Sequence, residues 1–137
     1  MAEVEFIDLA PHLHEDHRGM AYFPWQAQKL RDPASALHTF HLVSITPEQV
    51  RGNHLHPAYE EWLYVFHGQG VLWWETGAGE LKKRLMANGR TMIYIPPGVA
   101  HALENPGPEI LYLIAWRERS GSAAAELDTV PKVLTHK

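Results

Sequence analysis

Short runs of β-branched and aromatic residues, separated by Gly, Pro and Asn, make up most of the 137-residue chain. Apolar residues seldom recur at the spacing of three or four that an amphipathic helix needs, so this pattern predicts short strands. We expect about nine strands, in runs such as TFHLVSI (39–45), EWLYVF (61–66), GVLWWE (70–75), TMIYI (91–95) and EILYLIAW (109–116). So many short strands in one chain indicate an all-β antiparallel sandwich or barrel.

The length of the chain corresponds to one domain, with no internal repeat or linker. We expect residues 1–36 to form an N-terminal arm with edge strands, 37–117 the barrel, and 118–137 a tail that is either a short helix or loose. Helix signals are few. Thr46, followed by Pro47 and Glu48, could begin a single helical turn.

Composition excludes several classes of protein. The formal net charge is -4 and basic residues are scattered, so nucleic acid and membrane surfaces are not expected partners. No apolar run approaches the roughly 20 residues that span a bilayer. The first ten residues carry acids where a signal peptide would carry Lys or Arg, and the chain has no cysteine for disulfides or thiolate metal sites. We therefore expect a cytoplasmic protein that acts on a small molecule.

Two segments carry residues suited to metal chemistry. His54 and His56 lie two residues apart, so on an extended strand they share one face. Glu60 and Glu61 follow at the start of an apolar strand, where a buried carboxylate is costly unless a positive charge meets it. Further on, His101 follows a Pro-Pro-Gly turn among apolar residues and should face inward. Imidazole and carboxylate ligands together suit divalent transition metals.

These segments resemble the paired motifs of the cupin superfamily, with its RmlC-like jelly roll. The first motif, H-x-H, four residues, E, six residues, G, is matched by His54, His56, Glu61 and Gly68. The second, G, several residues, P-x-G, two residues, H, three residues, N, is matched by Gly89, Pro96, Gly98, His101 and Asn105, with one extra residue after Gly89. The resemblance implies a double-stranded β-helix barrel. It also implies one divalent metal (Fe, Mn, Ni or Zn) held by His54, His56, Glu61 and His101, the spacing to Gly68 favouring Glu61 over Glu60.

A finer resemblance concerns the string D-x-R-G at residues 16–19 and R-G-N-H-x-H at residues 51–56. Both are similar to strings in cupins that act on nucleotide-linked sugars, namely dTDP-4-dehydrorhamnose 3,5-epimerase and the sugar 3,4-ketoisomerases. This likeness implies an isomerase or epimerase in which His54 and Arg51 are catalytic and Arg18 and Arg51 bind substrate. The roles proposed for His54 compete, because a nitrogen that ligates a metal cannot also be a free base.

Other functions stay open at this level. A metal-dependent dioxygenase or lyase acting on a small organic acid is one alternative, and a non-catalytic cupin that binds a small molecule is another. Arg18 and Arg51 discriminate among them, since both should point into the barrel mouth if the substrate is a sugar nucleotide. The tyrosine acid of the epimerase has three unranked candidates, Tyr64, Tyr94 and Tyr112.

The other histidines have simpler expected roles. Those in the run PHLHEDHRG are expected on a surface loop without a second metal site: His12, His14 and His17. Surface or structural roles are expected for four more: His38, His41, His67 and His136. If Glu61 faces inward, Trp62, Tyr64 and Phe66 face outward and suggest a homodimer, or they pack against the second sheet of the same chain.

Overall fold

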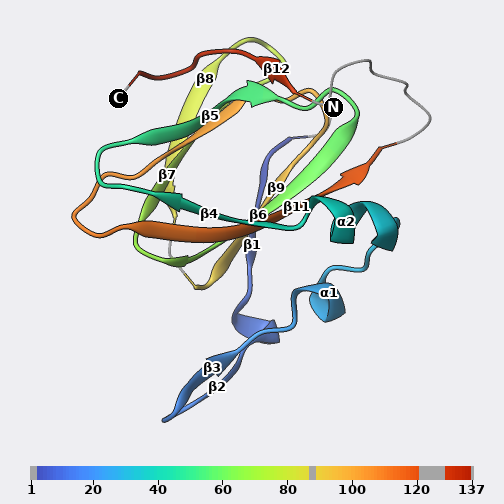
Figure 1. Cartoon of the computed structure of the whole chain (residues 1–137), viewed down its shortest axis with the longest axis vertical. Coiled ribbons are helices and arrows are strands. Elements are labelled where there is room, and N and C mark those ends of the chain that lie inside the picture. The colour runs from blue at the N-terminus through green and yellow to red at the C-terminus, as the bar shows by residue number, and fades with distance from the viewer. Residues whose placement is uncertain (1–2, 87–88, 121–128, 137) are drawn as a thin grey trace.

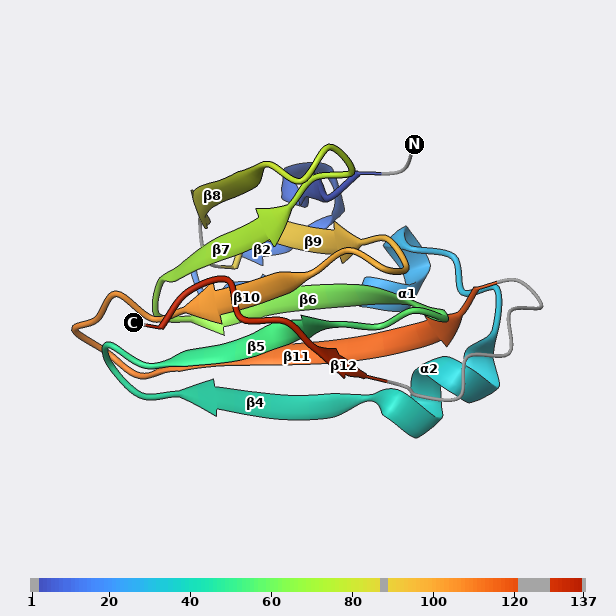
Figure 2. The same cartoon turned by 90° about the horizontal axis from the view of Figure 1, so that it is seen from above.

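The strands form two antiparallel sheets of five strands each, which pack face to face (Figure 1, Figure 2). This computed structural model describes residues 3–86, 89–120 and 129–136. The first sheet consists, in spatial order, of β1 (Glu5–Asp8), β9 (Thr91–Ile95), β6 (Tyr59–His67), β11 (Leu111–Arg119) and β4 (His41–Ile45). The second consists of β12 (Val130–Pro131), β5 (Val50–Leu55), β10 (His101–Glu104), β7 (Gly70–Glu75) and β8 (Leu81–Met86). This architecture confirms the predicted single-domain, all-β jelly roll.

Apolar side chains from both sheets fill the space between them. Residues two apart along a strand point to the same face, so alternate positions of each strand enter this core. The first sheet contributes Ile45, Leu63, Val65, Ile93, Ile95, Leu111, Leu113 and Ala115. The second sheet contributes Leu72, Met86 and Leu103. Burial of this apolar surface holds the sheets together and leaves the polar residues of the site at one end of the same interior.

The outer face of the first sheet is covered by the N-terminal part of the same chain. Leu9 from that part packs with Trp62, Tyr64 and Trp116 of the sheet, and all four are buried. The rings of Trp62 and Trp116 stack with centroids 6.1 Å apart. Trp62 and Tyr64 are therefore covered by the N-terminal part of the same chain rather than by its second sheet, whereas Phe66 is 45% exposed. The homodimer remains a prediction.

A hairpin and short helical segments precede the barrel. They are the 3-10 turn η1 (Ala10–His12), β2 (His14–Asp16), β3 (Gly19–Ala21), α1 (Pro24–Ala27) and α2 (Pro33–Thr39). The β2–β3 hairpin projects away from the two sheets (Figure 1). None of the helices in the described part of the chain has the length and apolar character needed to cross a membrane.

Helix α2 is absent from the sequence prediction, although it carries ordinary start signals. Its first helical residue is Pro33, and the Asp32 side chain caps it by accepting a hydrogen bond from the Ser35 backbone at 3.2 Å. The buried Glu118 carboxylate accepts hydrogen bonds from the backbone amides of Arg31 and Asp32 at 2.8 and 2.7 Å. A helix of only seven residues gives too short a periodic pattern to be recognised, so tertiary contacts decide its existence.

Two local expectations differ from the structure. The strand expected from Thr39 begins at His41, because Thr39 ends α2 and its hydroxyl bonds to both backbone groups of Arg117, 2.7 Å from the amide and 2.9 Å from the carbonyl. The segment after Thr46 forms a turn, not a helix, closed by the Gln49 amide, which donates to the Thr46 carbonyl at 3.1 Å.

Asn105 joins β4 to the loop between β10 and β11. Its side chain is fully buried, and its Nδ2 donates to the carbonyls of Ile45 and Glu109 at 2.7 and 2.8 Å. Its Oδ1 accepts from the Gly107 amide at 2.8 Å. Asparagine satisfies all three backbone groups because it carries donors and an acceptor on one short side chain.

Asn105→Asp should lower the free energy of unfolding by about 3 kcal/mol, because an ionised carboxylate cannot donate to two buried carbonyls and is repelled by them. Urea unfolding measures this loss. Gln69→Glu makes the same chemical change at an exposed position between β6 and β7 and should leave the free energy of unfolding nearly unchanged. Equal effects of the two changes would show that the buried hydrogen bonds of Asn105 are unimportant.

Candidate metal centre

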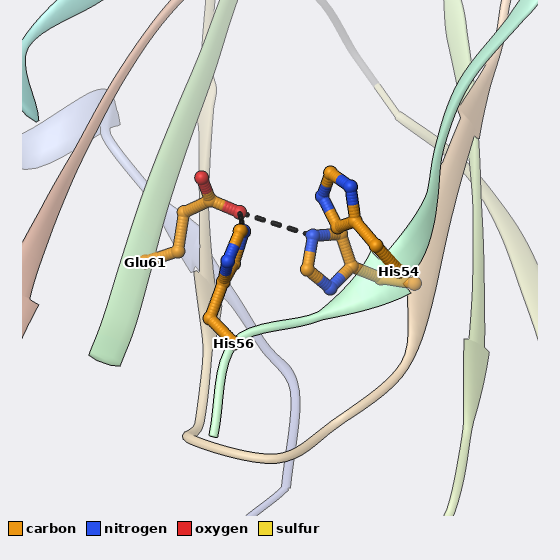
Figure 3. Close-up of side chains that lie close together, drawn as sticks. His54, His56 and Glu61 are labelled. Atoms are coloured by element: carbon orange, nitrogen blue, oxygen red, sulfur yellow. Dashed lines mark ion pairs between the residues drawn. The ribbon is translucent and has the colours of Figure 1, made fainter. Parts of the chain in front are cut away.

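Three imidazoles and one carboxylate meet inside the barrel. One ligand atom from each of His54, His56, Glu61 and His101 lies within 4.8 Å of the ligand atom of every other. Figure 3 shows the side chains of His54, His56 and Glu61 converging. His56, Glu61 and His101 are buried, and His54 is partly buried. The four residues expected as metal ligands therefore form one cluster.

The backbone of β5 places His54 beside β10, and His56 follows directly after the strand. His54 pairs with His101 in the ladder, and Gly52 pairs with Ala102, so Asn53 is an extra residue that bulges from β5. Gly52 has a φ of +100°, and a side chain there would come within 3.0 Å of the His101 carbonyl. Glycine is thus required for the close approach of the strands that brings the imidazoles together.

The structure separates the two neighbouring glutamates. Glu61 points into the cluster, where its Oε1 lies 3.0 Å from His101 Nε2 and 3.6 Å from His56 Nε2. Glu60 points to the opposite face of β6, where it accepts a hydrogen bond from the Tyr94 hydroxyl at 3.0 Å and forms an ion pair with Arg31. The alternation of side chains along a strand allows only one of them to face the histidines.

The geometry of His101 fits a bound cation. Its Nδ1 lies 3.0 Å from the Val99 carbonyl, which can only accept, so Nδ1 carries the proton of the neutral ring. The lone pair of Nε2 then points at Glu61 Oε1, another acceptor, at 3.0 Å. Two acceptors this close require a shared proton or a metal ion. A histidine that donates its outer N–H to a backbone carbonyl is also the usual arrangement of a metal ligand.

The protonation states of His54 and Glu61 suit metal binding. Burial, together with the positive charge that His101 and His56 can carry, lowers the pKa of His54 to about 4. Burial alone would raise the pKa of Glu61, but the rings of His101 and His56, which donate hydrogen bonds and bring positive charge when protonated, outweigh it and hold this pKa well below its usual range. His54 is therefore neutral and Glu61 ionised at neutral pH, the forms that ligate metals.

A cavity of about 540 Å³ opens onto the cluster between the two sheets. His54, Glu61 and His101 line one part of it, and His41 and Arg51 line another. The rest of its wall is apolar, formed by Val43, Ile45, Val50, Leu63, Leu103, Leu113 and Ala115, with Gly52. A metal held by the cluster would face this cavity, and a small molecule could reach it there.

The two arginines expected to bind substrate lie in different places. Arg51 is in the cavity wall, where its Nε donates to the Ser44 carbonyl at 3.0 Å. Arg18 lies on the projecting β2–β3 hairpin and forms an exposed ion pair with Asp16 at 2.5 Å. It does not line the cavity. The structure thus brings Arg51, but not Arg18, to the site of the same chain.

His41, for which the sequence predicts a surface or structural role, is exposed and also lines the cavity. It shares a strand face with Val43 and Ile45, which are partly or fully buried, so the alternation of β4 could have revealed it. Its Nδ1 lies 2.7 Å from the Thr39 carbonyl, which places the lone pair of the neutral ring on Nε2. The arm histidines are exposed and, within the described residues, are not part of any group of three potential ligands: His12, His14 and His17.

Glu61→Gln should weaken zinc binding by more than about 100-fold, because loss of a metal ligand lowers the affinity more than loss of a residue that only hydrogen-bonds to a ligand. A competition titration with a chromophoric chelator measures this affinity. Glu60→Gln, which makes the same change one residue earlier, should bind zinc like the wild type. Comparable losses in the two variants, or none in either, would contradict the assignment of Glu61 as a ligand.

The metal-free protein should lose stability as the pH falls from 7 to 5. His54 has a pKa of about 4 in the folded state and near 6.5 when unfolded, so the unfolded chain binds more protons between these values. The contribution of His54 to the free energy of unfolding is fully present above pH 6.5 and is lost as the pH falls toward 4. The contribution of Glu61 is lost only below its unfolded pKa of 4.5. Thermal unfolding in the presence of a metal chelator should show a smaller fall in Tm between pH 7 and pH 5 for His54→Gln than for the wild type. An equal fall in the two proteins would contradict the lowered pKa of His54.

Solved structures of sugar-processing proteins have the same fold. CapF of Staphylococcus aureus, a capsular polysaccharide assembling protein, is 23% identical with a TM-score of 0.60; the match covers 69% of this chain but only 26% of CapF. The sugar 3,4-ketoisomerase QdtA of Thermoanaerobacterium thermosaccharolyticum, in complex with TDP, is 16% identical with a TM-score of 0.72, covering 95% of this chain and 88% of QdtA. A dTDP sugar isomerase of Desulfovibrio desulfuricans is 11% identical with a TM-score of 0.73, and the match covers 93% of this chain and 82% of the isomerase.

No curated protein matches the chain. The sequence profile of the cupin domain, in contrast, matches residues 41–117, which is more than half of the chain. This range contains all four clustered ligands and the cavity. The two-sheet jelly roll and the profile agree, and the chain belongs to the cupin family.

Proposed function

We propose that this cupin is a metal-dependent isomerase or epimerase of a keto sugar, with its reaction centre in the barrel cavity. The observation that carries the proposal is the opening of the cluster of His54, His56, Glu61 and His101 onto a cavity whose wall also holds Arg51. The cluster offers ligands for iron, manganese, nickel or zinc, and the cavity leaves room for a small substrate.

A bound divalent metal would supply a Lewis acid for the oxygen that gains negative charge in the reaction. With His54 as a ligand, another group must remove the proton from the carbon beside the carbonyl and return it, to the same carbon in an epimerase or to the former carbonyl carbon in an isomerase. His41 suits this role because its Nδ1 is held by the Thr39 carbonyl and its Nε2 can accept a proton from a molecule in the cavity. Without a metal, His54 itself would be the base, but its lowered pKa makes it a weak one.

Arg51 is proposed to bind an anionic part of the substrate. Among the described residues that line the cavity, it is the only lysine or arginine, and its bond to the Ser44 carbonyl fixes the guanidinium in the wall. The fork of donors on arginine matches a phosphate or a carboxylate. A structurally similar ketoisomerase, QdtA, has been solved with TDP-4-keto-6-deoxyglucose, which supports a nucleotide-linked sugar as the substrate class.

A second candidate function is metal-dependent chemistry on a small organic acid, as in a dioxygenase or lyase. The mostly apolar cavity wall, with a single arginine, favours it, because one carboxylate would satisfy Arg51 while the rest of the molecule met apolar side chains. Arg18 adds no positive charge to this cavity, since it lies on the projecting hairpin and is not among the described residues that line the cavity.

The protein loaded with each candidate metal should convert TDP-4-keto-6-deoxyglucose in deuterated water with incorporation of deuterium into the sugar, as followed by proton NMR. Arg51→Met should lower kcat/KM by at least about tenfold, mainly through KM. His41→Phe should lower kcat by about 100-fold or more, as expected for loss of a general acid–base group.

Lys82→Met removes a cation from the exposed strand β8 and should leave the kinetics unchanged. Absence of both turnover and deuterium incorporation with every metal would contradict the isomerase proposal. Consumption of oxygen with small keto acids, measured on the same preparations, would then favour the second candidate.

A further inference from the structure

The imidazole of His41 is bonded to the end of helix α2. Its Nδ1 lies 2.7 Å from the carbonyl of Thr39, which is the last residue of α2. The last carbonyls of a helix have no partner within the helix, and the ring of His41 satisfies one of them. Because a carbonyl can only accept, the neutral ring carries its proton on Nδ1 and its lone pair on Nε2.

This hydrogen bond cannot by itself fix the ring of His41. The residue is exposed, so water competes with the carbonyl for the proton on Nδ1. The ring keeps one orientation only if its acceptor is held within reach. The orientation of His41 therefore depends on what holds the Thr39 carbonyl in place.

The side chain of Thr39 attaches this end of the helix to β11. The register that pairs His41 with Ala115 would place residue 39 opposite Arg117, but Thr39 is helical. Its hydroxyl takes the place of a backbone pair, because Oγ1 accepts from the Arg117 amide at 2.7 Å and lies 2.9 Å from the Arg117 carbonyl, to which it can donate. Two carbonyls of the preceding helical turn, at 2.8 and 3.5 Å, are alternative acceptors for its proton. The bond from the Arg117 amide does not depend on which of them receives it.

Both ends of α2 are fixed to consecutive residues of β11. The Glu118 carboxylate accepts hydrogen bonds from two backbone amides at the start of the helix, and Arg117 bonds to Thr39 at its end. Arg117 also pairs with Glu61 of the metal centre across the ladder between β11 and β6. The Thr39 carbonyl, and with it the ring of His41, is thus held relative to the strand pair that carries the cluster.

We propose that Thr39 is a positioning residue for His41: its hydroxyl fixes the helix end whose carbonyl holds Nδ1, so that Nε2 presents its lone pair to the cavity. Proton transfer needs the acid–base group within hydrogen-bond reach of the substrate and correctly oriented, so a small displacement of the ring slows it strongly. This inference rests on the proposed function of His41 as the proton carrier. It adds a residue that belongs neither to the ligand cluster nor to the described cavity wall.

Two matched variants of the full-length chain test the hydroxyl. Thr39→Val keeps the shape of the side chain but removes the oxygen, whereas Thr39→Ser keeps the oxygen and loses only a methyl group. Nitrogen-15 NMR of the metal-free protein with labelled imidazoles, at a pH where the ring is neutral, shows which nitrogen of His41 carries the proton. The wild type and Thr39→Ser should carry it on Nδ1, and Thr39→Val should show a mixture of both tautomers.

Kinetics of the metal-loaded protein measure the consequence for the reaction. Thr39→Val should lower kcat for TDP-4-keto-6-deoxyglucose by about 10-fold with little change in KM, and Thr39→Ser should restore most of it. In a His41→Phe background, Thr39→Val should lower kcat no further, because the ring that it positions is gone.

Ser35→Ala is the matched control. It removes another hydroxyl that donates to the Arg117 carbonyl, at 3.0 Å, without changing residue 39. It should alter neither kcat nor the tautomer of His41. Circular dichroism and urea unfolding confirm that each variant is folded.

The same tautomer of His41 in the wild type and Thr39→Val, or equal effects of Ser35→Ala and Thr39→Val, would overturn the positioning role. A further fall of kcat in the His41→Phe background would do the same, as would a proton on Nε2 of His41 in the wild type, whatever the folding of the variants. If the wild type does not convert the sugar with any metal, the proposed function fails. The NMR comparison then decides by itself whether Thr39 positions the ring.

Discussion

The contact of the buried Glu61 carboxylate with the imidazoles of His101 and His56 is the interaction on which the site depends. A carboxylate in the barrel interior is costly to bury alone, and here it faces nitrogen atoms at 3.0 and 3.6 Å. The neutral ring of His101 meets it with a lone pair, which a cation between them would satisfy. The same contact explains why the cluster is polar in an otherwise apolar interior, and why it faces the cavity.

The surrounding structure holds these groups in place through backbone features. The bulge at Asn53 and the close approach at Gly52 bring β5 against β10, so three histidines, two of them in or directly after β5 and one in β10, meet one glutamate from the opposite sheet. The N-terminal segment covers the outer face of that sheet, and Asn105 ties the loop after β10 to β4. Ligand geometry thus depends on long-range pairing as much as on the ligands themselves.

Periodicity predicted most of the strands, and the resemblance to the cupin motifs predicted the four residues that form the cluster. TMIYI forms β9 at the predicted residues, and the spacing of two between His54 and His56 placed them together, because both signals are local. Contacts between distant segments carried no such signal: α2 depends on Glu118, and Thr129 reaches His56 only because β12 pairs with β5. That His41 lines the cavity was not predicted, although the alternation of β4 places it on the same face as Val43 and Ile45.

Anomalous diffraction from crystals of the metal-loaded protein tests the central claim most directly. We expect one strong peak, about 2.0–2.2 Å from a nitrogen of each of His54, His56 and His101 and from an oxygen of Glu61. We also expect the cavity side of the metal to be open to water or substrate. A peak bound elsewhere, or no peak among these four residues after incubation with iron, manganese, nickel and zinc in turn, would contradict the account.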